Sequence, residues 1–194
     1  MTPEPKQLTK QDGLIIWFTG LSGAGKTTLS LKLKNRLMEQ GLHTYVLDGD
    51  LIRMGLNSDL GFSLEDRREN IRRIGEVARL FTDADIVTIV AFISPLREDR
   101  ERVKASLPVK QFVEIFVDCP LEICEQRDTK GLYKKARKGE IKNFTGISSP
   151  YEPPLAPDIH INTDKESIDE STQIMMNYFN SKGYFLHKPN SQTH

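Results

Sequence analysis

Apolar residues follow two spacings along this chain, and the alternation of the two predicts strands separated by helices. Leu29, Leu33 and Leu37 recur at the spacing of one helix face, as do Ile71, Ile74 and Ala78. Short runs rich in apolar residues predict strands at 15–18, 44–47, 86–92, 112–117 and 159–161. Strands that alternate with helices form a parallel sheet with helices on both faces, so we expect a three-layer α/β/α fold.

Capping residues suggest where several of the helices begin. Ser63 followed by Asp66 resembles a capping box and predicts a helix from there to about residue 81. Pro120 is suited to the start of a helix that carries Cys124 and Arg127. Thr163 with Glu166 predicts the start of the final helix by the same capping pattern. A charged helix is expected at about 97–107.

The organisation of the chain is predicted to be a single domain between two polar ends. Residues 1–12 contain two prolines and no periodic apolar pattern, and we expect a flexible lead-in there. The domain itself is expected at 13–184, and a flexible tail at 185–194. Within the domain, helical periodicity is lost from residue 130 onward, where lysines and glycines gather, and this predicts a mobile lid at about 130–145.

Composition narrows the classes of function that the chain can have. The 194 residues include 27 Lys and Arg against 27 Asp and Glu, so no overall charge draws the protein to nucleic acid or to an anionic membrane. No apolar run approaches the ~20 residues of a membrane span. Cys119 and Cys124 are too few for a disulfide framework or a zinc site. We therefore expect a cytoplasmic protein that binds neither nucleic acid nor membrane.

A phosphate-binding loop is predicted between the first strand and the first helix. Glycines let the backbone curl so that its N–H groups point at phosphate oxygens, and the helix dipole strengthens that anion site. Lys26 is expected to reach the β- and γ-phosphates of ATP, and the hydroxyl of Thr27 to bind Mg²⁺. The alternative is a glycine-rich turn without a ligand. The residues expected to surround the phosphates are Gly20, Leu21, Ser22, Gly23, Ala24, Gly25, Lys26, Thr27 and Thr28.

A second group of polar residues follows the predicted second strand. Asp50 and Arg53 come just after that strand, and Arg67 and Asn70 lie one turn apart near the start of the next helix. The carboxyl ends of parallel strands meet at one edge of the sheet, so this group should lie beside the phosphate loop. Arg53 and Arg67 could hold a second anion, and Phe62 could stack on a base. A surface loop and a solvated helix face are the alternatives.

Several longer motifs closely resemble the adenylylsulfate kinase family over about residues 10–183. Those that carry the resemblance include GLSGAGKTT at 20–28, DGD-x-IR-x-GLN-x-DLGFS at 48–63, DR-x-ENIRRIGEVA at 66–78, AFISPLREDR at 91–100, RD-x-KGLYKKAR-x-G at 127–139 and FTGI-x-SPYE at 144–152. The resemblance implies an α/β P-loop kinase that forms homodimers and uses Mg²⁺ and ATP to phosphorylate the ribose 3′-hydroxyl of adenosine 5′-phosphosulfate.

The resemblance also implies roles for individual residues. It places Asp50 beside the acceptor hydroxyl, and it matches Ser94 to a serine described in the family as a phosphoserine intermediate. P-loop kinases need only align donor and acceptor, so we favour direct transfer, with Ser94 positioning the substrate. The residues that match the family's adenylylsulfate contacts are Arg53, Phe62, Arg67, Asn70, Ile93 and Phe144.

Two parts of a kinase site need further residues. The third strand ends without the acidic residue usual in P-loop proteins, so Mg²⁺ would be held by Thr27, phosphates and water, with Asp50 acting through water. Negative charge that develops on the phosphates in the transition state must be neutralised, and the lysines and arginines of the lid could supply the cations. The alternative is that these residues are only a run of solvent-exposed charges. The lid and nucleotide contacts expected are Arg127, Lys130, Lys134 and Arg137.

These expectations favour an enzyme that converts ATP and adenylylsulfate to ADP and 3′-phosphoadenylylsulfate, with a functional link to ATP sulfurylase. Two alternatives come from different classes. One is another small-molecule P-loop kinase, such as a gluconate or nucleoside kinase. The other is a catalytically silent nucleotide-binding domain that regulates a sulfurylase.

Overall fold

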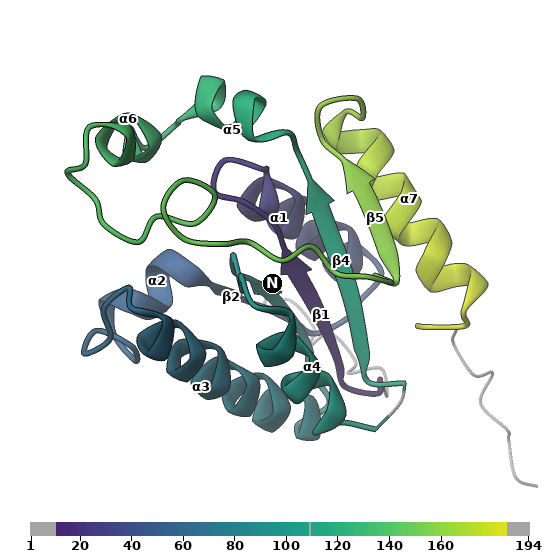
Figure 1. Ribbon diagram of the computed structural model, residues 1–194. Coiled ribbons are helices and arrows are strands. Elements are labelled where there is room, and N and C mark those ends of the chain that lie inside the picture. The colour runs from purple at the N-terminus through teal and green to yellow at the C-terminus, as the bar shows by residue number, and fades with distance from the viewer. Residues whose placement is uncertain (1–10, 109, 186–194) are drawn as a thin grey trace, which may run out of the picture.

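The computed structural model describes residues 11–108 and 110–185 (Figure 1). Nearly all of the lead-in expected at 1–12 and of the tail expected at 185–194 lies outside these described residues. The domain boundaries at 12/13 and 184/185 stay predictions. The described part forms one set of layers around a central sheet, and the fold is the one that the alternating pattern predicts.

A five-stranded parallel sheet lies at the centre of the protein, in the order β2-β3-β1-β4-β5. The strands are β1 (Leu14–Thr19), β2 (Thr44–Asp48), β3 (Val87–Ala91), β4 (Phe112–Asp118) and β5 (Ile159–Asn162). β1, β3 and β4 consist almost entirely of buried residues because helices cover the sheet on both faces. All five strands run in the same direction, so their carboxyl ends share one edge.

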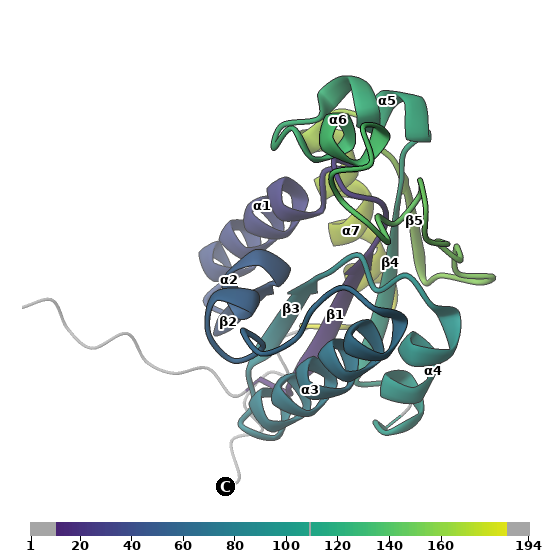
Figure 2. The ribbon, with the colours of Figure 1, turned by 60° about the vertical axis from the view of Figure 1, so that its left-hand side comes forward.

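Four long helices form the two outer layers (Figures 1 and 2). α1 (Lys26–Glu39) and α7 (Ile168–Ser181) pack on one face of the sheet, and α3 (Leu64–Asp83) and α4 (Arg97–Ala105) on the other. Side chains of β1 alternate between the two cores: Ile16 and Phe18 join the first, and Ile15 and Trp17 the second. This arrangement confirms the predicted three-layer α/β/α architecture.

Three short helices lie at the carboxyl edge of the sheet, where the predicted site should be. They are α2 (Gly49–Met54), α5 (Leu121–Arg127) and α6 (Leu132–Arg137). The start of α5 after Pro120 was expected. α2 and α6 fall in segments for which the sequence indicated loop, and each has six residues. Figures 1 and 2 show α5 and α6 above the ends of the strands.

The start of α7 corrects one prediction. Two successive segments fit the capping pattern, Thr163 to Glu166 and Ser167 to Glu170, and the second is the real cap. The Ser167 hydroxyl accepts from the Glu170 N–H at 3.2 Å, and the Glu170 carboxylate accepts from the Ser167 N–H at 2.8 Å. The Thr163 hydroxyl is used elsewhere. By contrast, Ser63 caps α3 as expected, accepting from the Asp66 N–H at 3.1 Å.

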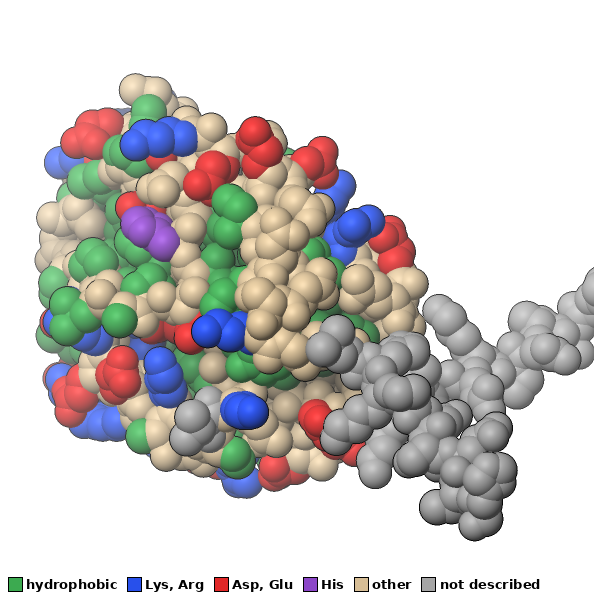
Figure 3. All heavy atoms as spheres, turned by 90° about the vertical axis from the view of Figure 1, so that its right-hand side faces the viewer, with side chains coloured by type: hydrophobic (Ala, Val, Ile, Leu, Met, Phe, Trp, Pro, Cys, Tyr) green, Lys and Arg blue, Asp and Glu red, His purple; other side chains and the backbone are tan. Residues whose placement is uncertain are grey.

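The surface over α7 and β5 carries both signs of charge (Figure 3). Lys and Arg side chains are interspersed there with Asp and Glu, and apolar side chains lie between them. This mixture on one face agrees with equal numbers of basic and acidic residues in the whole chain. Within the described residues, no helix is both long and apolar enough to cross a membrane.

Candidate active site

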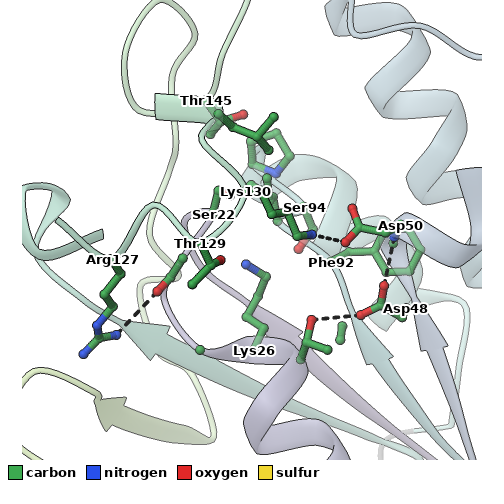
Figure 4. A pocket seen from close by; sticks show the side chains of 18 of the residues that line it. Ser22, Lys26, Asp48, Asp50, Phe92, Ser94, Arg127, Thr129, Lys130 and Thr145 are labelled. Carbon is green, nitrogen blue, oxygen red and sulfur yellow. Dashed lines mark hydrogen bonds and ion pairs between the residues drawn. The ribbon is translucent and has the colours of Figure 1, made fainter. Parts of the chain in front are cut away.

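A cavity of about 910 Å³ opens at the carboxyl edge of the sheet, where the predicted site residues were expected to meet. Its walls come from the loop between β1 and α1, from α2, α3 and the turn after β3, and from the segment around α6. Figure 4 shows Lys26 at the bottom, with Asp48 and Asp50 to one side of it and Arg127 to the other, and Lys130 pointing toward Asp50. A cavity of this size matches the 300–1,000 Å³ typical of small-molecule sites.

The loop between β1 and α1 has the backbone that a phosphate cradle needs. Gly20, Gly23 and Gly25 all have positive φ, of 150°, 76° and 103°. A Cβ on Gly20 would lie 2.3 Å from the Val117 carbonyl oxygen, and one on Gly23 would lie 3.1 Å from that of Cys124. Glycine is therefore favoured at all three positions by conformation, and at Gly20 it is also required by space. The loop ends where α1 begins, so the positive end of that helix faces the cavity.

Lys26 lies under this loop with 9% of its surface exposed. Its ammonium donates to the carbonyl oxygens of Gly20 at 2.9 Å and Leu21 at 2.7 Å. Burial disfavours the charged form and lowers the pKa of Lys26 from 10.5 to about 8. A phosphate entering the loop would offer this ammonium anionic oxygens in place of neutral carbonyls.

The lowered pKa of Lys26 predicts that nucleotide binding takes up a proton in alkaline solution. At pH 9 the free protein holds Lys26 mostly neutral, whereas phosphate oxygens favour its protonated form, so binding should take up about one proton. At pH 7 Lys26 is protonated in both states and this uptake should vanish. Calorimetric titration with MgADP in two buffers of different ionisation enthalpy measures the uptake at each pH. Equal uptake at pH 7 and pH 9 would contradict the assignment.

Asp48 provides the acidic side chain that the third strand lacks. The Thr27 hydroxyl donates to the Asp48 carboxylate at 2.9 Å, and the other carboxylate oxygen accepts from the Asp50 N–H at 2.9 Å. Asp48 ends β2 directly beside Ala91 of β3, so it stands one strand away from the usual acidic position. Metal support was predicted from Asp50 through water, and no role was predicted for Asp48. The signal was available in the two carboxylates of Asp48 and Asp50, at the end of β2 and just after it.

The residues around Thr27 fit a hard divalent cation. The Thr27 hydroxyl and the Asp48 carboxylate place two oxygen ligands side by side, and oxygen is the ligand that Mg²⁺ prefers. No cluster of three or more His, Cys, Asp or Glu side chains that could hold a metal occurs in the described residues. Nucleotide phosphates and water would complete the coordination shell, as Mg²⁺ in kinase sites requires.

Two arginines and an aromatic ring form the opposite side of the cavity. The guanidinium carbon of Arg53 lies 4.5 Å from the centroid of the Phe62 ring, and that of Arg67 lies 5.6 Å from it. Neither arginine pairs with a carboxylate in the described part of the chain. Burial, and then the nearby charge of Arg53, lowers the pKa of Arg67. Two crowded cations without an acidic partner make this side of the cavity a good place for an anion.

The Arg67 side chain bridges two segments that are distant in sequence. It donates to the carbonyl oxygen of Phe62 at 3.1 Å and to that of Asn143 at 2.6 Å. Asn70, one turn along α3, is buried and accepts from the Asn57 side-chain amide at 2.9 Å. Both Arg67 and Asn70 line the cavity, so the structure brings these two predicted site residues together.

Ile93, Ser94 and Phe144, which the family resemblance indicated, also line the cavity. Ser94 is 2% exposed and has a φ of 41°, a left-handed conformation that costs a residue of this kind about 1–3 kcal/mol. Its hydroxyl accepts a hydrogen bond from the indole N–H of Trp17 at 3.1 Å. In the described part of the chain, no carboxylate or imidazole hydrogen-bonds to the Ser94 hydroxyl.

The basic residues expected in the lid divide into two groups. Arg127 and Lys130 line the cavity, and the Lys130 ammonium pairs with the Asp50 carboxylate across it. Lys134 and Arg137 lie on α6 and are absent from the cavity lining, and Arg137 pairs with Glu125 of α5. A helix of six residues presents only part of its surface to the site. The structure thus places Arg127 and Lys130 at the cavity and Lys134 and Arg137 outside its lining.

Thr163 is a site residue that sequence reasoning assigned to a helix cap. Its hydroxyl donates to the carbonyl oxygen of Ala24 in the phosphate loop at 2.8 Å, and it accepts from Arg127 at 3.2 Å. It therefore ties β5 and α5 to the loop, and it lines the cavity beside Arg127. A short strand that ends at a sheet edge with polar residues was the signal that could have identified it.

The model of the family described as adenylylsulphate kinase matches residues 12–162, which is most of the chain. The chain belongs to the adenylylsulfate kinase family. An adenylyl-sulfate kinase of Oceanobacillus iheyensis is 56% identical to it over 179 residues, covering 92% of this chain and 90% of that relative. This membership confirms the resemblance found in the motifs and removes the reason to prefer a gluconate or nucleoside kinase.

Solved members of the adenylylsulfate kinase family share the fold. The APS kinase of Mycobacterium tuberculosis, solved in complex with AMPPNP and APS, is 47% identical with a TM-score of 0.83, covering 88% of this chain and 99% of that one. A hexameric APS kinase from Thiobacillus denitrificans is 36% identical with a TM-score of 0.70; the match covers 91% of this chain and 30% of that one. The P-loop kinase fold predicted from the sequence is confirmed.

Proposed function

We propose that this protein transfers the γ-phosphoryl group of ATP to the ribose 3′-hydroxyl of adenosine 5′-phosphosulfate, which yields ADP and 3′-phosphoadenylylsulfate. One observation carries the proposal: a single cavity joins a phosphate loop to a pocket with two arginines that lack acidic partners. Membership of the family supports it, as does the relative solved with AMPPNP and APS. A compact sugar would leave the two cations and the aromatic ring of Phe62 without a purpose.

ATP would occupy the phosphate-loop half of the cavity. The N–H groups of residues 20–28 would hold the phosphates, and Lys26 would exchange its carbonyl partners for β- and γ-phosphate oxygens. Thr27 and Asp48 would hold Mg²⁺, directly or through water. The metal ion, when bound, would neutralise the charge that develops between the β- and γ-phosphates. Arg127 and Thr163 lie at the end of this half where the base would rest.

Adenylylsulfate would occupy the other half. Its phosphosulfate carries negative charge toward Arg53 and Arg67, and its adenine would stack on an aromatic ring, Phe62 or Phe144. Phe62 is 55% exposed, so one part of its ring is free for a planar ligand. Ile93, Ser94 and Asn70 would complete the walls of this acceptor pocket.

Transfer would be direct. The 3′-oxygen attacks the γ-phosphorus as the bond from that phosphorus to the bridging oxygen of ADP breaks, and the hydroxyl proton passes to the Asp50 carboxylate. Asp50 is 69% exposed at its side chain and pairs with Lys130, so binding of the substrate would replace one contact of that pair. Ser94 has no base beside its hydroxyl in the described residues, which supports a positioning role for it.

The lid expected at 130–145 would be anchored to the phosphate loop through Tyr133 of α6. The Tyr133 hydroxyl donates to the Ser22 carbonyl of the phosphate loop at 2.8 Å, and the Phe144 ring lies 4.9 Å from that of Tyr133. The segments that flank α6, which we call its arms, place Lys130 on one side and Lys142 on the other in the cavity lining. We infer that closure moves these arms around an anchored α6 and does not lift the whole segment.

The proposal is tested by ADP release from the purified protein with Mg²⁺ and ATP. Release that depends on adenylylsulfate supports the function proposed. Release stimulated by gluconate or by a nucleoside would favour another small-molecule kinase, and no release with any acceptor would favour a silent regulator of a sulfurylase. Identification of 3′-phosphoadenylylsulfate by mass spectrometry separates transfer from simple ATP hydrolysis.

The acceptor pocket can be tested apart from the nucleotide site. Arg67→Ala should weaken adenylylsulfate binding by about tenfold or more, because it removes a charged hydrogen-bonding group, and Phe62→Ala should weaken it by removing the stacking surface. Binding of ATP should change little in either variant. Calorimetric titration with each nucleotide measures both affinities. Arg72→Ala, on the exposed side of α3, is the matched control, and equal losses for both nucleotides would mean that the two pockets are wrongly assigned.

The assembly and setting of the protein are proposed from the family. We expect a homodimer, and the hexameric relative makes the oligomeric state worth measuring by light scattering. Cys119 and Cys124 are buried free thiols, which supports a cytoplasmic location, where ATP is also available. A functional link to ATP sulfurylase follows from the substrate, because an enzyme that makes adenylylsulfate from sulfate must supply it.

A further inference from the structure

An arginine outside the cavity lining hydrogen-bonds to the turn after β3 on the side away from the cavity. Arg100 of α4 is 1% exposed, and one of its terminal nitrogens donates to the Ser94 carbonyl oxygen at 2.6 Å. Ser94 itself lines the cavity and has a left-handed backbone conformation, with a φ of 41°. An unfavourable backbone conformation persists where the surroundings hold it, so the groups that bind this turn decide its shape.

The rest of the Arg100 guanidinium is fully engaged. Its Nε donates to the Glu114 carboxylate of β4 at 2.8 Å, and its other terminal nitrogen donates to the Glu152 carbonyl oxygen at 2.8 Å. Glu114 is 4% exposed at its side chain, so the ion pair is buried. A planar guanidinium fixed on three sides has a single orientation, and the nitrogen that faces Ser94 cannot turn away.

Two further hydrogen bonds hold the same turn from β1. The Trp17 indole N–H donates to the Ser94 hydroxyl at 3.1 Å, and the Thr19 hydroxyl donates to the Ile93 carbonyl oxygen at 2.8 Å. The backbone and side chain of Ser94 are thus fixed together, and Ile93 is fixed with them. These two residues line the proposed acceptor pocket, whereas the hydrogen bonds of Arg100 go to Glu114, Ser94 and Glu152 and none goes to the phosphate loop.

We propose that Arg100 is a positioning residue for the acceptor: through the Ser94 carbonyl it sets the shape of the adenylylsulfate pocket without touching the ligand. The inference rests on the proposed function, because it assigns Ile93 and Ser94 to that pocket. It predicts a selective effect. Loss of the guanidinium fork relaxes the wall of the acceptor pocket and leaves the ATP half intact.

The test compares KM values for both substrates in Arg100→Lys and Arg100→Met. Arg100→Lys keeps the charge beside Glu114 but cannot make all three hydrogen bonds, and Arg100→Met keeps only the bulk. We expect the KM for adenylylsulfate to rise about tenfold in Arg100→Met and by less in Arg100→Lys, because a lysine can replace one hydrogen bond. The KM for ATP should stay within about twofold of wild type. Arg102→Met, an exposed residue on the same helix, is the matched control.

Every outcome of this comparison bears on the proposal. KM does not depend on the fraction of protein that is folded, so a destabilised variant still gives a valid answer, and melting temperatures report stability separately. Equal rises for both substrates, or no rise for adenylylsulfate, would overturn the positioning role. Failure of both variants to fold would do so too, since Arg100 would then serve the fold alone. If wild-type protein shows no turnover dependent on adenylylsulfate, the proposed function is wrong. That result concerns the wild type alone and is therefore distinguishable from the variant results that test the role of Arg100.

Discussion

Lys26→Ala should abolish phosphoryl transfer while the protein stays folded. The substitution removes the buried ammonium that would meet the β- and γ-phosphates, and the loss of a positioned charge at developing negative charge lowers the rate by about a hundredfold or more. The carbonyl oxygens of Gly20 and Leu21 would lose a donor but remain within reach of water at the open side of the cavity. ADP release under saturating ATP and adenylylsulfate measures the effect.

The control for this substitution lies on the same helix. Lys32→Ala removes an ammonium of α1 that is 43% exposed and pairs with Asp169 on α7, well apart from the phosphate loop. Its turnover should match wild type, and circular dichroism should give the same helix content for both variants. Turnover close to wild type in Lys26→Ala would sink the assignment of residues 20–28 as the ATP site.

Asp50→Asn should be far more damaging than Ser94→Ala. The first substitution keeps the shape of the side chain but removes the carboxylate that takes the hydroxyl proton, and loss of such a group costs about a hundredfold or more. The second removes the acceptor of one hydrogen bond from Trp17, so activity should fall by no more than about tenfold. Steady-state kcat for both variants, measured beside Asp83→Asn on the exposed end of α3, gives the comparison.

A rapid-quench experiment distinguishes direct transfer from a covalent relay. Wild-type protein mixed with labelled ATP alone should carry no phosphate on Ser94, because no base stands by its hydroxyl in the described residues. A phosphoserine at position 94 that forms and decays at the turnover rate would reverse this conclusion. In that case Ser94→Ala would eliminate transfer, and a base would have to accept the proton of the Ser94 hydroxyl when that oxygen attacks ATP.

The strands and long helices could be predicted because each carries a dense local signal. The run from Ile86 to Phe92 contains only apolar residues apart from Thr88, and a strand at 87–91 follows from it. α2 and α6 carried no such signal, because six residues are too few for a periodic pattern and both contain several charges. Short helices of this kind depend on their neighbours, and a single sequence says little about those.

Some residues of the candidate site could be predicted from the sequence and others could not. Residues that occupy strand ends or motif positions, such as Lys26, Arg67 and Ser94, were placed in the cavity from the sequence alone, and the structure brings them together. Lys134 and Arg137 were selected by charge, and which way a charged side chain points depends on packing that charge does not encode. Asp48 was passed over because its role depends on Thr27 lying 2.9 Å away.

Trp17 is the single tryptophan of the chain, and its indole N–H is bonded to Ser94 in the wall of the acceptor pocket. Indole emission responds to hydrogen bonding and to the polarity around the ring. The protein therefore carries an intrinsic fluorophore that is buried behind the wall of the proposed adenylylsulfate half, on the far side of β1 from the core under α1. We expect its emission to change when adenylylsulfate occupies the cavity beside Ser94 and to respond less to ATP, so equilibrium and stopped-flow titrations should distinguish the two substrates without any label.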